Sequence, residues 1–377
     1  MSCCTQNIVG LFTEMAIRIV IACGGTGGHL FPGIAVAEAL REQGGESLVL
    51  ISEKEIDALA IKGYDDFCFE TVPAMGMPRV LSPKMIPFSL RFLRTLCRCK
   101  RIVSEFRADA VLGMGGFTSL APLMAGRRHG AKVFIHESNA FPGKANRIAA
   151  RGADSVLLGL PACRRYFPGK DVEVVGTPLR KVMRQKHDRA ASLARFGLEE
   201  GRKTLLVMGG SQGARGINQA VTGALEHISG LGMQIIHLTG PADLEEVRKG
   251  YSSAPLPYFV SDFCHDMHQA YSAADVAIAR SGASSLAELS AFSLPTILVP
   301  FHYATDDHQT LNAQVYAECG AAEILKEKEI EPRSLERLLQ EFTKDNGAVL
   351  AEMSSAMNGM AIRNAAENIC KSIEMRC

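Results

Sequence analysis

The sequence IRIVIACGGTGGHLFPG occupies residues 17–33, and it decides how the rest of the chain is interpreted. Ile17, Ile19 and Ile21 form a β-branched alternation that predicts a buried strand, and four glycines around Thr26 follow it. A strand, a glycine turn and a helix N-terminus bring free N–H groups and a positive dipole end together, which suits a phosphate or another anion. A tight turn without any ligand has the same pattern, so this stretch alone leaves both interpretations open.

The same design recurs twice along the chain. Residues 203–214 read KTLLVMGGSQGA, and residues 110–120 read AVLGMGGFTSL. Neither the dinucleotide fingerprint G-x-G-x-x-G nor the P-loop motif is matched. Two similar units, one opening each half of the chain, predict a duplicated α/β architecture with a cleft between the halves.

The composition indicates a globular protein of about two domains. The chain has 377 residues, of which 47% are hydrophobic, and its net charge of +1 gives no reason to expect a nucleic-acid partner. Its eleven cysteines lack C-x-x-C pairs and indicate reduced thiols rather than a disulfide framework. No window holds the roughly 18 uninterrupted apolar residues of a membrane span. Residues 1–14 lack the pattern of a signal peptide, and we expect them to form a disordered extension before a start at Met15.

Strands and helices alternate through both halves, which predicts an α/β fold with two Rossmann-like, doubly wound parallel-sheet domains facing across a cleft. Further strands are expected at residues 47–51, 110–112, 132–136, 155–158, 204–208, 234–238, 275–279 and 296–299. The expected units are a first domain at 15–177, a second at 178–357, and a C-terminal segment at 358–377. Residues 172–180, VEVVGTPLR, are the predicted linker, and a helix over 360–375 is expected to pack back on the first domain.

A basic segment interrupts this alternation. Residues 79–107 contain eight Lys and Arg side chains and a single acid, Glu105. On a helix, one face would carry Arg91, Arg94, Arg98 and Arg101, and another would carry Phe92, Leu96, Cys99 and Val103. With the apolar loops before it, this pattern is typical of a surface that rests on anionic lipid. The expected membrane surface is Arg91, Arg94, Arg98, Phe88 and Phe92, and the alternative is a domain helix with solvated arginines.

Polar residues that could bind a ligand or take part in catalysis follow several predicted strands. His136, Glu137 and Asn139 stand at the carboxyl end of one strand, where ligands gather in such sheets. Residues 280–288, RSGASSLAE, predict a helix start with backbone donors, and Glu288 one turn later can accept from two vicinal hydroxyls. Gln309 and Asn312 are an amide pair suited to sugar hydroxyls. No D-x-D motif occurs, and His265 and His268 lack partners, so no metal cofactor is predicted.

Seven motifs together resemble one family, in its order. They are GGTGGH at 24–29, GMGGF at 113–117, HESN at 136–139, GTPLR at 176–180, GGSQGA at 209–214, RSGASSLAE at 280–288 and DHQTLNA at 307–313. From Met15 onward the chain resembles the MurG family of peptidoglycan N-acetylglucosaminyltransferases. The resemblance implies transfer of GlcNAc from UDP-GlcNAc to the C4 hydroxyl of MurNAc in undecaprenyl-pyrophosphoryl-MurNAc-pentapeptide (lipid I), with inversion, giving lipid II. Ser138 and His308 replace the glutamines usual in the family, which puts any contact by those amides in doubt.

The resemblance also implies roles for individual residues. The implied catalytic residues are His29, Glu137 and Arg180, with His29 as a general base or as a ligand of the acceptor diphosphate. The implied acceptor side is Gly24, Gly25, His29, Gly115, Gly116, His136 and Glu137. The implied donor site is Thr26, Gly27, Gly28, Asn139, Arg180, Ser211, Gln212, Gly213, Phe263, Cys264, Ala283, Ser284, Ser285, Glu288, Gln309 and Asn312.

The implied location is peripheral, on the cytoplasmic face of the inner membrane. The expected partners are UDP-GlcNAc, lipid I, the anionic inner leaflet and other proteins of cell-wall synthesis or division. A role in cell shape and the cell cycle would follow. Three alternatives remain: a glycosyltransferase acting on another lipid acceptor, a UDP-GlcNAc 2-epimerase, and a non-catalytic scaffold that binds UDP without turnover.

Overall fold

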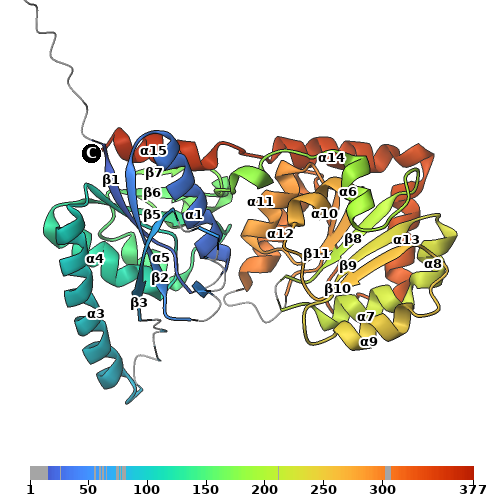
Figure 1. The fold of residues 1–377 in the computed structure, drawn as a ribbon, viewed down its shortest axis with the longest axis horizontal. Helices are drawn as coiled ribbons and strands as arrows, with labels where there is room; N and C mark the ends of the chain where they lie inside the picture. The colour runs from blue at the N-terminus through green and yellow to red at the C-terminus, as the bar shows by residue number, and fades with distance from the viewer. Residues whose placement is uncertain are drawn as a thin grey trace, which may run out of the picture.

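Two parallel sheets form the centres of the two domains (Figure 1). The computed structural model describes residues 16–25, 27–54, 57–58, 61, 63–64, 66–73, 76, 78, 82–210, 212–301 and 307–377; the expected extension at 1–14 lies outside them. The first sheet contains β1 (Arg18–Ala22), β2 (Glu46–Ser52), β3 (Cys68–Val72), β4 (Ala110–Gly113), β5 (Lys132–Glu137), β6 (Ser155–Leu158) and β7 (Val172–Val174). The second contains β8 (Thr204–Met208), β9 (Gln234–Leu238), β10 (Tyr258–Ser261), β11 (Val276–Ala279), β12 (Thr296–Leu298) and β13 (Ala322–Ile324).

Both sheets are doubly wound, which confirms the predicted fold class. Their strand orders are β3-β2-β1-β4-β5-β6-β7 and β10-β9-β8-β11-β12-β13, and every strand pairing among the described residues is parallel. Each order reverses beside the strand that opens its domain, β1 or β8. In sheets of this kind, ligands bind at the carboxyl ends of the strands near that reversal. The first and the third glycine loops follow the neighbouring strands β1 and β4, and the second follows β8.

Helices cover both faces of each sheet, so each sheet has two apolar cores. The helices of the first half are α1 (Gly27–Glu42), α3 (Met85–Phe106), α4 (Leu120–His129) and α5 (Lys144–Ala149). Those of the second half are α6 (Arg189–Arg195), α7 (Arg215–Gly223), α8 (Leu225–Gly230), α9 (Leu244–Tyr251), α10 (Met267–Ala273), α11 (Ala283–Ala291), α12 (His308–Glu318), α13 (Pro332–Thr343), α14 (Ala348–Gly359) and α15 (Ala365–Glu374). In the first domain, α1 and α15 cover one face, and α3, α4 and α5 cover the other.

The central strands agree closely with the sequence predictions, whereas three edge strands were not predicted. Strands β6, β8 and β9 have the predicted bounds, and each is fully buried. Strands β3, β10 and β13 stand at sheet edges and are largely exposed or half-buried. An edge strand has only one neighbour and needs no continuous apolar run, so its sequence carries a weak signal.

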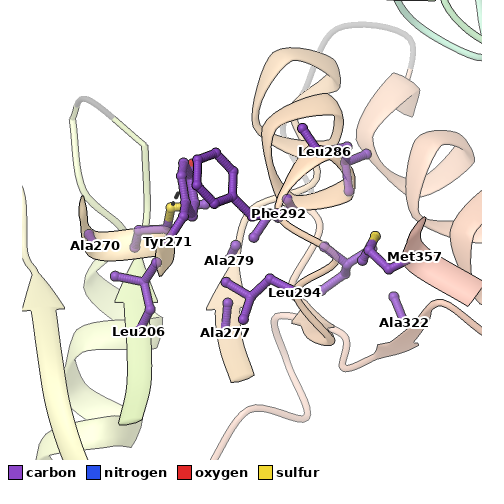
Figure 2. Packing of buried hydrophobic residues seen from close by; sticks show 14 of the residues in the cluster. Leu206, Ala270, Tyr271, Ala277, Ala279, Leu286, Phe292, Leu294, Ala322 and Met357 are labelled. Carbon is purple, nitrogen blue, oxygen red and sulfur yellow. Dashed lines mark hydrogen bonds between the residues drawn. The ribbon is translucent and has the colours of Figure 1, made fainter. Parts of the chain in front are cut away.

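One of the apolar cores of the second domain supports the region that carries Glu288. Tyr271 from α10 packs against Phe292, which follows α11, with ring centroids 5.2 Å apart (Figure 2). Leu286 and Met357 complete the packing around α11. All four side chains are at most 2% exposed, so α11 is held firmly at its inner face.

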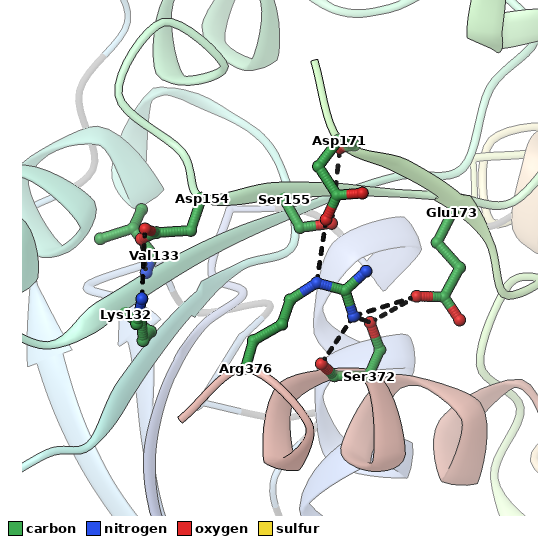
Figure 3. Close-up of polar contacts among 8 residues, drawn as sticks. All are labelled: Lys132, Val133, Asp154, Ser155, Asp171, Glu173, Ser372 and Arg376. Carbon is green, nitrogen blue, oxygen red and sulfur yellow. Dashed lines mark hydrogen bonds and ion pairs between the residues drawn. The ribbon is translucent and has the colours of Figure 1, made fainter.

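The chain crosses between the domains twice. It leaves the first sheet after β7, enters the second domain through residues 175–180, and returns between α14 and α15. The helix predicted over 360–375 is therefore wrong at its start, because α14 ends at Gly359 and α15 begins only at Ala365. At the end of α15, Arg376 pairs with Asp171 at 2.9 Å and with Glu173 at 3.3 Å, which fastens it to β7 (Figure 3).

Candidate active site

The first glycine loop fits tightly against the neighbouring strand. A Cβ on Gly24 would lie 2.1 Å from the Ser52 nitrogen, and Gly25 has a φ of +117°. The backbone N–H of Gly25 donates to Asp57 Oδ2 at 2.7 Å, and Ser52 donates to the same oxygen from its backbone and its hydroxyl. These positions therefore require glycine, and a buried carboxylate fixes the loop from beneath. Thr26 lies outside the described residues, and α1 begins at Gly27 with Gly28 exposed.

His29 lies in the first turn of α1 and faces the third glycine loop. A Cβ added to Gly115 would lie 2.8 Å from His29 Nε2, so the imidazole occupies the space that glycine leaves open. Gly115 and Gly116 have φ values of +114° and +74°. Burial lowers the pKa of His29 below its usual value, although the carboxylates of Glu137 and Asp57 oppose the shift. The ring is therefore mainly neutral at pH 7, the state in which an imidazole can take up a proton.

Glu137 holds the loop that follows it through hydrogen bonds to its carboxylate. Its Oε1 accepts from the backbone and the side chain of Asn139 at 3.0 and 2.9 Å, and its Oε2 accepts from Gly143 N and Asn146 Nδ2, both at 2.9 Å. The residue is 3% exposed. A buried carboxylate with four donors is well satisfied, so this geometry favours a positioning role over proton abstraction.

His136 contacts the linker instead of facing solvent. It is fully buried, and its Nε2 lies 2.8 Å from the carbonyl oxygen of Gly176. Because a carbonyl only accepts, Nε2 carries the proton, and Nδ1 accepts from the Ser138 hydroxyl at 3.4 Å. Burial lowers the pKa of His136, which keeps the ring neutral. Ser138, the departure from the family pattern, thus contacts the imidazole two residues before it.

The second glycine loop packs against the next loop of its sheet. A Cβ on Gly213 would lie 2.0 Å from the Thr239 carbonyl oxygen, and Gly213 has a φ of +75°. Gln212 is exposed, and Ser211 lies outside the described residues. Helix α7 begins at Arg215 without a side-chain cap, so its first N–H groups are open to an anion.

A second uncapped helix N-terminus belongs to α11. Its first turn carries Ala283, Ser284 and Ser285, all half-buried, and Gly282 at the N-cap offers no side chain. Ser284 Oγ donates to the Gly28 carbonyl oxygen at 3.1 Å. The N-terminal turns of α11 and α1 therefore meet at the junction of the two domains.

Glu288 lies one turn into α11 and is oriented by Tyr271, whose hydroxyl donates to Oε2 at 2.8 Å. Burial raises the pKa of Glu288, and the Tyr271 hydroxyl and the Arg180 charge oppose that rise. Arg180 stacks over the ring of Phe31 of α1, with its guanidinium carbon 4.5 Å from the centroid. The linker arginine thus contacts α1 of the first domain, and its charge acts on Glu288 of the second.

The remaining predicted donor residues differ in their surroundings. Phe263 is 52% exposed and meets the His265 ring edge-on at 4.9 Å, while burial raises the pKa of the neighbouring Cys264. Gln309 Oε1 accepts from the Phe301 backbone N–H at 3.0 Å. Asn312 is fully buried and bonds to the first domain.

Comparison with known proteins agrees with this geometry over nearly the whole chain. Residues 19–158 match the glycosyltransferase family 28 N-terminal domain, and residues 204–369 match the family 28 C-terminal domain. A relative from Citrifermentans bemidjiense, named UDP-N-acetylglucosamine–N-acetylmuramyl-(pentapeptide) pyrophosphoryl-undecaprenol N-acetylglucosamine transferase, is 35% identical over 364 residues, 95% of this chain and 99% of the relative. The chain belongs to the MurG family of glycosyltransferases.

Other matches support this membership. A Myxococcus xanthus relative with the same name is 36% identical over 336 residues, covering 86% of this chain and 84% of its own. The crystal structure of Acinetobacter baumannii MurG aligns with a TM-score of 0.76 at 28% identity over 95% and 99% of the two chains. A UDP-N-acetylglucosamine 2-epimerase structure from Listeria monocytogenes, at 14% identity and a TM-score of 0.71 over 96% of each chain, shares the fold alone.

Two residues of this MurG family site were not predicted from the sequence. Asp57 holds Gly25 from beneath, and Tyr271 orients Glu288. A buried acid or tyrosine has no motif of its own, and their contacts span 32 and 17 residues. Among the described residues, no group of three or more His, Cys, Asp and Glu side chains could hold a metal ion.

Helix α3 lies at the outer edge of the first domain (Figure 1). The apolar face predicted for lipid is partly wrong, because Leu96, Cys99 and Val103 are buried against the domain, and the half-buried Phe92 packs on the same core and stacks with Phe88. The exposed apolar side chains are instead Ile86 (71%), Leu90 (56%) and Leu93 (56%). Among the basic residues, Arg91 lies 3.9 Å from Glu53, Arg98 lies 3.2 Å from Glu70, and Arg94 is exposed. No helix within the described residues is both long and apolar enough to cross a bilayer.

Proposed function

We propose that this protein transfers GlcNAc from UDP-GlcNAc to the C4 hydroxyl of MurNAc in undecaprenyl-pyrophosphoryl-MurNAc-pentapeptide, with inversion, to form lipid II. The near full-length similarity to curated transferases of that name carries the proposal. The meeting of the α1 and α11 N-termini at the domain junction supports it, because a diphosphate donor and a diphosphate-linked acceptor both need anion sites near one point.

In the proposed reaction, the second domain binds the donor. Glu288, already oriented by Tyr271, accepts hydrogen bonds from the two ribose hydroxyls. The charge that develops on UDP as it leaves is stabilised by the N-termini of α7 and α11 and by Arg180 at the linker. No metal ion is needed in this scheme, because helix dipoles and a guanidinium supply the positive charge.

The first domain supplies the acceptor side. His29 is kept mainly neutral by its surroundings and takes the proton from the MurNAc hydroxyl as that oxygen attacks the anomeric carbon. The glycine loops at Gly24–Gly25 and Gly115–Gly116 let the backbone approach the acceptor diphosphate closely, while Asp57 holds the Gly25 N–H. Glu137 and His136 act by holding the neighbouring loop and the linker.

The direct test is transfer of radiolabelled GlcNAc from UDP-GlcNAc to a short-chain lipid I analogue. A labelled lipid product supports the proposal. Conversion of UDP-GlcNAc to its 2-epimer with no labelled lipid would establish the epimerase alternative, and UDP binding without turnover would establish the scaffold alternative.

The surface around α3 supports a peripheral position on the inner leaflet of the plasma membrane. A role in cell-wall synthesis, cell shape and division follows from the proposed reaction. Ile86, Leu90 and Leu93 are exposed beside Arg91 and Arg94, the combination that anionic lipid attracts. Reversal of Arg91, Arg94 and Arg98 to Glu should abolish binding to vesicles containing anionic lipid and leave UDP affinity unchanged. Equal vesicle binding by this variant would make α3 an ordinary domain face.

A further inference from the structure

Lys54 places a positive charge beside the first glycine loop. It follows β2, and its Nζ donates to the Gly25 carbonyl oxygen at 3.0 Å. The side chain is exposed, and it forms no ion pair within the part of the chain that the structure describes. An ammonium group has three hydrogens, so two of them remain for an anion at this loop.

The ammonium group is held at a defined point because the loop beneath it is fixed. The Gly25 N–H donates to Asp57 Oδ2 at 2.7 Å, and Thr118 Oγ1 donates to the Gly24 carbonyl oxygen at 2.7 Å. These bonds set the direction of the Gly25 carbonyl group that accepts from Lys54. A ligand that binds here therefore meets a cation already in place, and less side-chain freedom is lost on binding.

The same loop needs a positive charge if it is to hold a diphosphate. Asp57 is fully buried beneath it, and its Oδ1 has no hydrogen-bond partner among the described residues. A carboxylate close to a diphosphate repels it. The positive end of α1, which begins at Gly27, offsets part of this repulsion, and Lys54 supplies a full positive charge at the neighbouring carbonyl group.

Lys54 also lies on the side of the first domain where a lipid-linked substrate would arrive. The preceding residue, Glu53, has a carboxylate oxygen 3.9 Å from Arg91 Nη2 of α3. On that helix, Arg91 stands between the exposed Leu90 and Leu93. Residues 53–54 therefore join the helix proposed to rest on lipid to the loop proposed to bind the acceptor. A diphosphate that links a membrane-embedded chain to a sugar would lie between these two places.

We propose that Lys54 binds the diphosphate of the lipid-linked acceptor, with its ammonium group positioned by the Gly25 carbonyl oxygen. One ammonium hydrogen stays on Gly25, and the other two donate to phosphate oxygens. The inference rests on the proposed function for the identity of the acceptor. Binding of a diphosphate-linked lipid by the donor-free protein does not depend on turnover, so it can be measured separately.

The test compares the wild type with Lys54→Met, Lys54→Arg and a control, Lys170→Met. Lys54→Met keeps the apolar stem and removes the charge. Lys170 is the matched control, because it is an exposed lysine of the first domain whose Nζ also donates to a backbone carbonyl oxygen, that of Arg151, at 3.3 Å. Thermal unfolding checks that each variant is folded, and Lys54→Gln replaces Lys54→Met if it is not.

Two fluorescent, short-chain acceptor analogues are used, without vesicles or detergent. One is a lipid I analogue with the diphosphate, and in the other an uncharged linker of the same length replaces the diphosphate. Fluorescence anisotropy gives the dissociation constant of each analogue. Calorimetry gives the affinity for UDP, and the steady-state transfer rate is measured with the diphosphate analogue at saturating UDP-GlcNAc.

Lys54→Met should raise the dissociation constant of the diphosphate analogue by about 10- to 100-fold, the scale of hydrogen bonds to charged groups. The acceptor kcat/KM should fall by the same factor. UDP affinity should change by less than about twofold, since UDP is proposed to bind the second domain. Lys54→Arg should recover most of the loss because it keeps the charge, and Lys170→Met should behave as the wild type. The uncharged analogue should bind equally to Lys54→Met and to the wild type.

Equal affinity of Lys54→Met and the wild type for the diphosphate analogue would overturn the proposal, and so would a wild-type protein that does not bind this analogue. An equal loss of affinity for both analogues would make Lys54 only a support of the loop. An effect seen only after anionic vesicles are added would assign Lys54 to the membrane surface instead. If the wild type binds the diphosphate analogue but makes no labelled lipid, the proposed function fails, whereas the dissociation constants still decide the role of Lys54.

Discussion

Removal of the Glu288 carboxylate should weaken UDP binding by a calculable amount. One carboxylate oxygen already accepts from Tyr271, and the other has no hydrogen-bond partner among the residues that the structure describes. Two ribose hydroxyls that donate to an ionised carboxylate form charge-assisted bonds, and the loss of such contacts costs about 2–3 kcal/mol. Glu288→Ala should therefore raise the dissociation constant of UDP by about 30- to 150-fold at 25 °C.

Calorimetric titrations with UDP and with inorganic pyrophosphate measure this effect. Pyrophosphate binding should not change, because the helix N-termini remain, and Tyr271→Phe should weaken UDP binding less than Glu288→Ala because it removes only the orienting hydroxyl. Thermal unfolding of each variant controls for loss of structure, since Tyr271 is buried beside Phe292. A folded Glu288→Ala protein that binds UDP as tightly as the wild type would refute the assignment.

Three further results are expected. Transfer should survive EDTA, and Arg180→Ala should lower kcat by about 100-fold with a smaller change in donor KM; full inhibition by EDTA that Mg²⁺ reverses would contradict this. His29→Gln should remove the acidic limb of the kcat profile, which in the wild type lies below pH 6.5 because burial lowers the His29 pKa; a retained limb, with acceptor binding lost, would make His29 a phosphate ligand. Burial lowers the pKa of His237 to about 3, so protons bind the unfolded chain first as the pH falls below about 6.5. The free energy of unfolding should then drop by about 3 kcal/mol between pH 7 and pH 4.5. In urea titrations, His237→Gln should reduce this drop in the free energy of unfolding, whereas His129→Gln, a control at an exposed histidine, should leave it unchanged. Equal drops in the two variants would refute the role of His237.

The sequence predicts the centre of each sheet better than its edges, for a physical reason. Strand β8 is buried along its full length, so its sequence is a continuous apolar run that predicts a buried strand. Strand β3 is mostly exposed and has no such run. The glycine loops could also be predicted, because a Cβ at Gly24 would overlap the backbone of strand β2 and one at Gly213 would overlap the backbone of a neighbouring loop. Such positions can be recognised in the local sequence as glycines.

Contacts between distant segments cannot be recognised in this way. The sequence presents Asn312 as half of an amide pair for a sugar, and only the folded chain shows that it faces Asn139, 173 residues away. Likewise, helical periodicity separates two faces of α3 but does not say which one packs on the domain. The assignment of its exposed apolar residues depends on that packing.

Helix α15 has a consequence for how the protein is made. Ala366, Ile369, Cys370 and Ile373 belong to the same apolar core as β1 and α1, yet they leave the ribosome after the entire second domain. During synthesis, the nascent first domain therefore exposes an apolar surface on α1 while some 200 further residues are translated, on the order of ten seconds or more. The domain that is translated first is completed last, and the interval favours its protection by a chaperone.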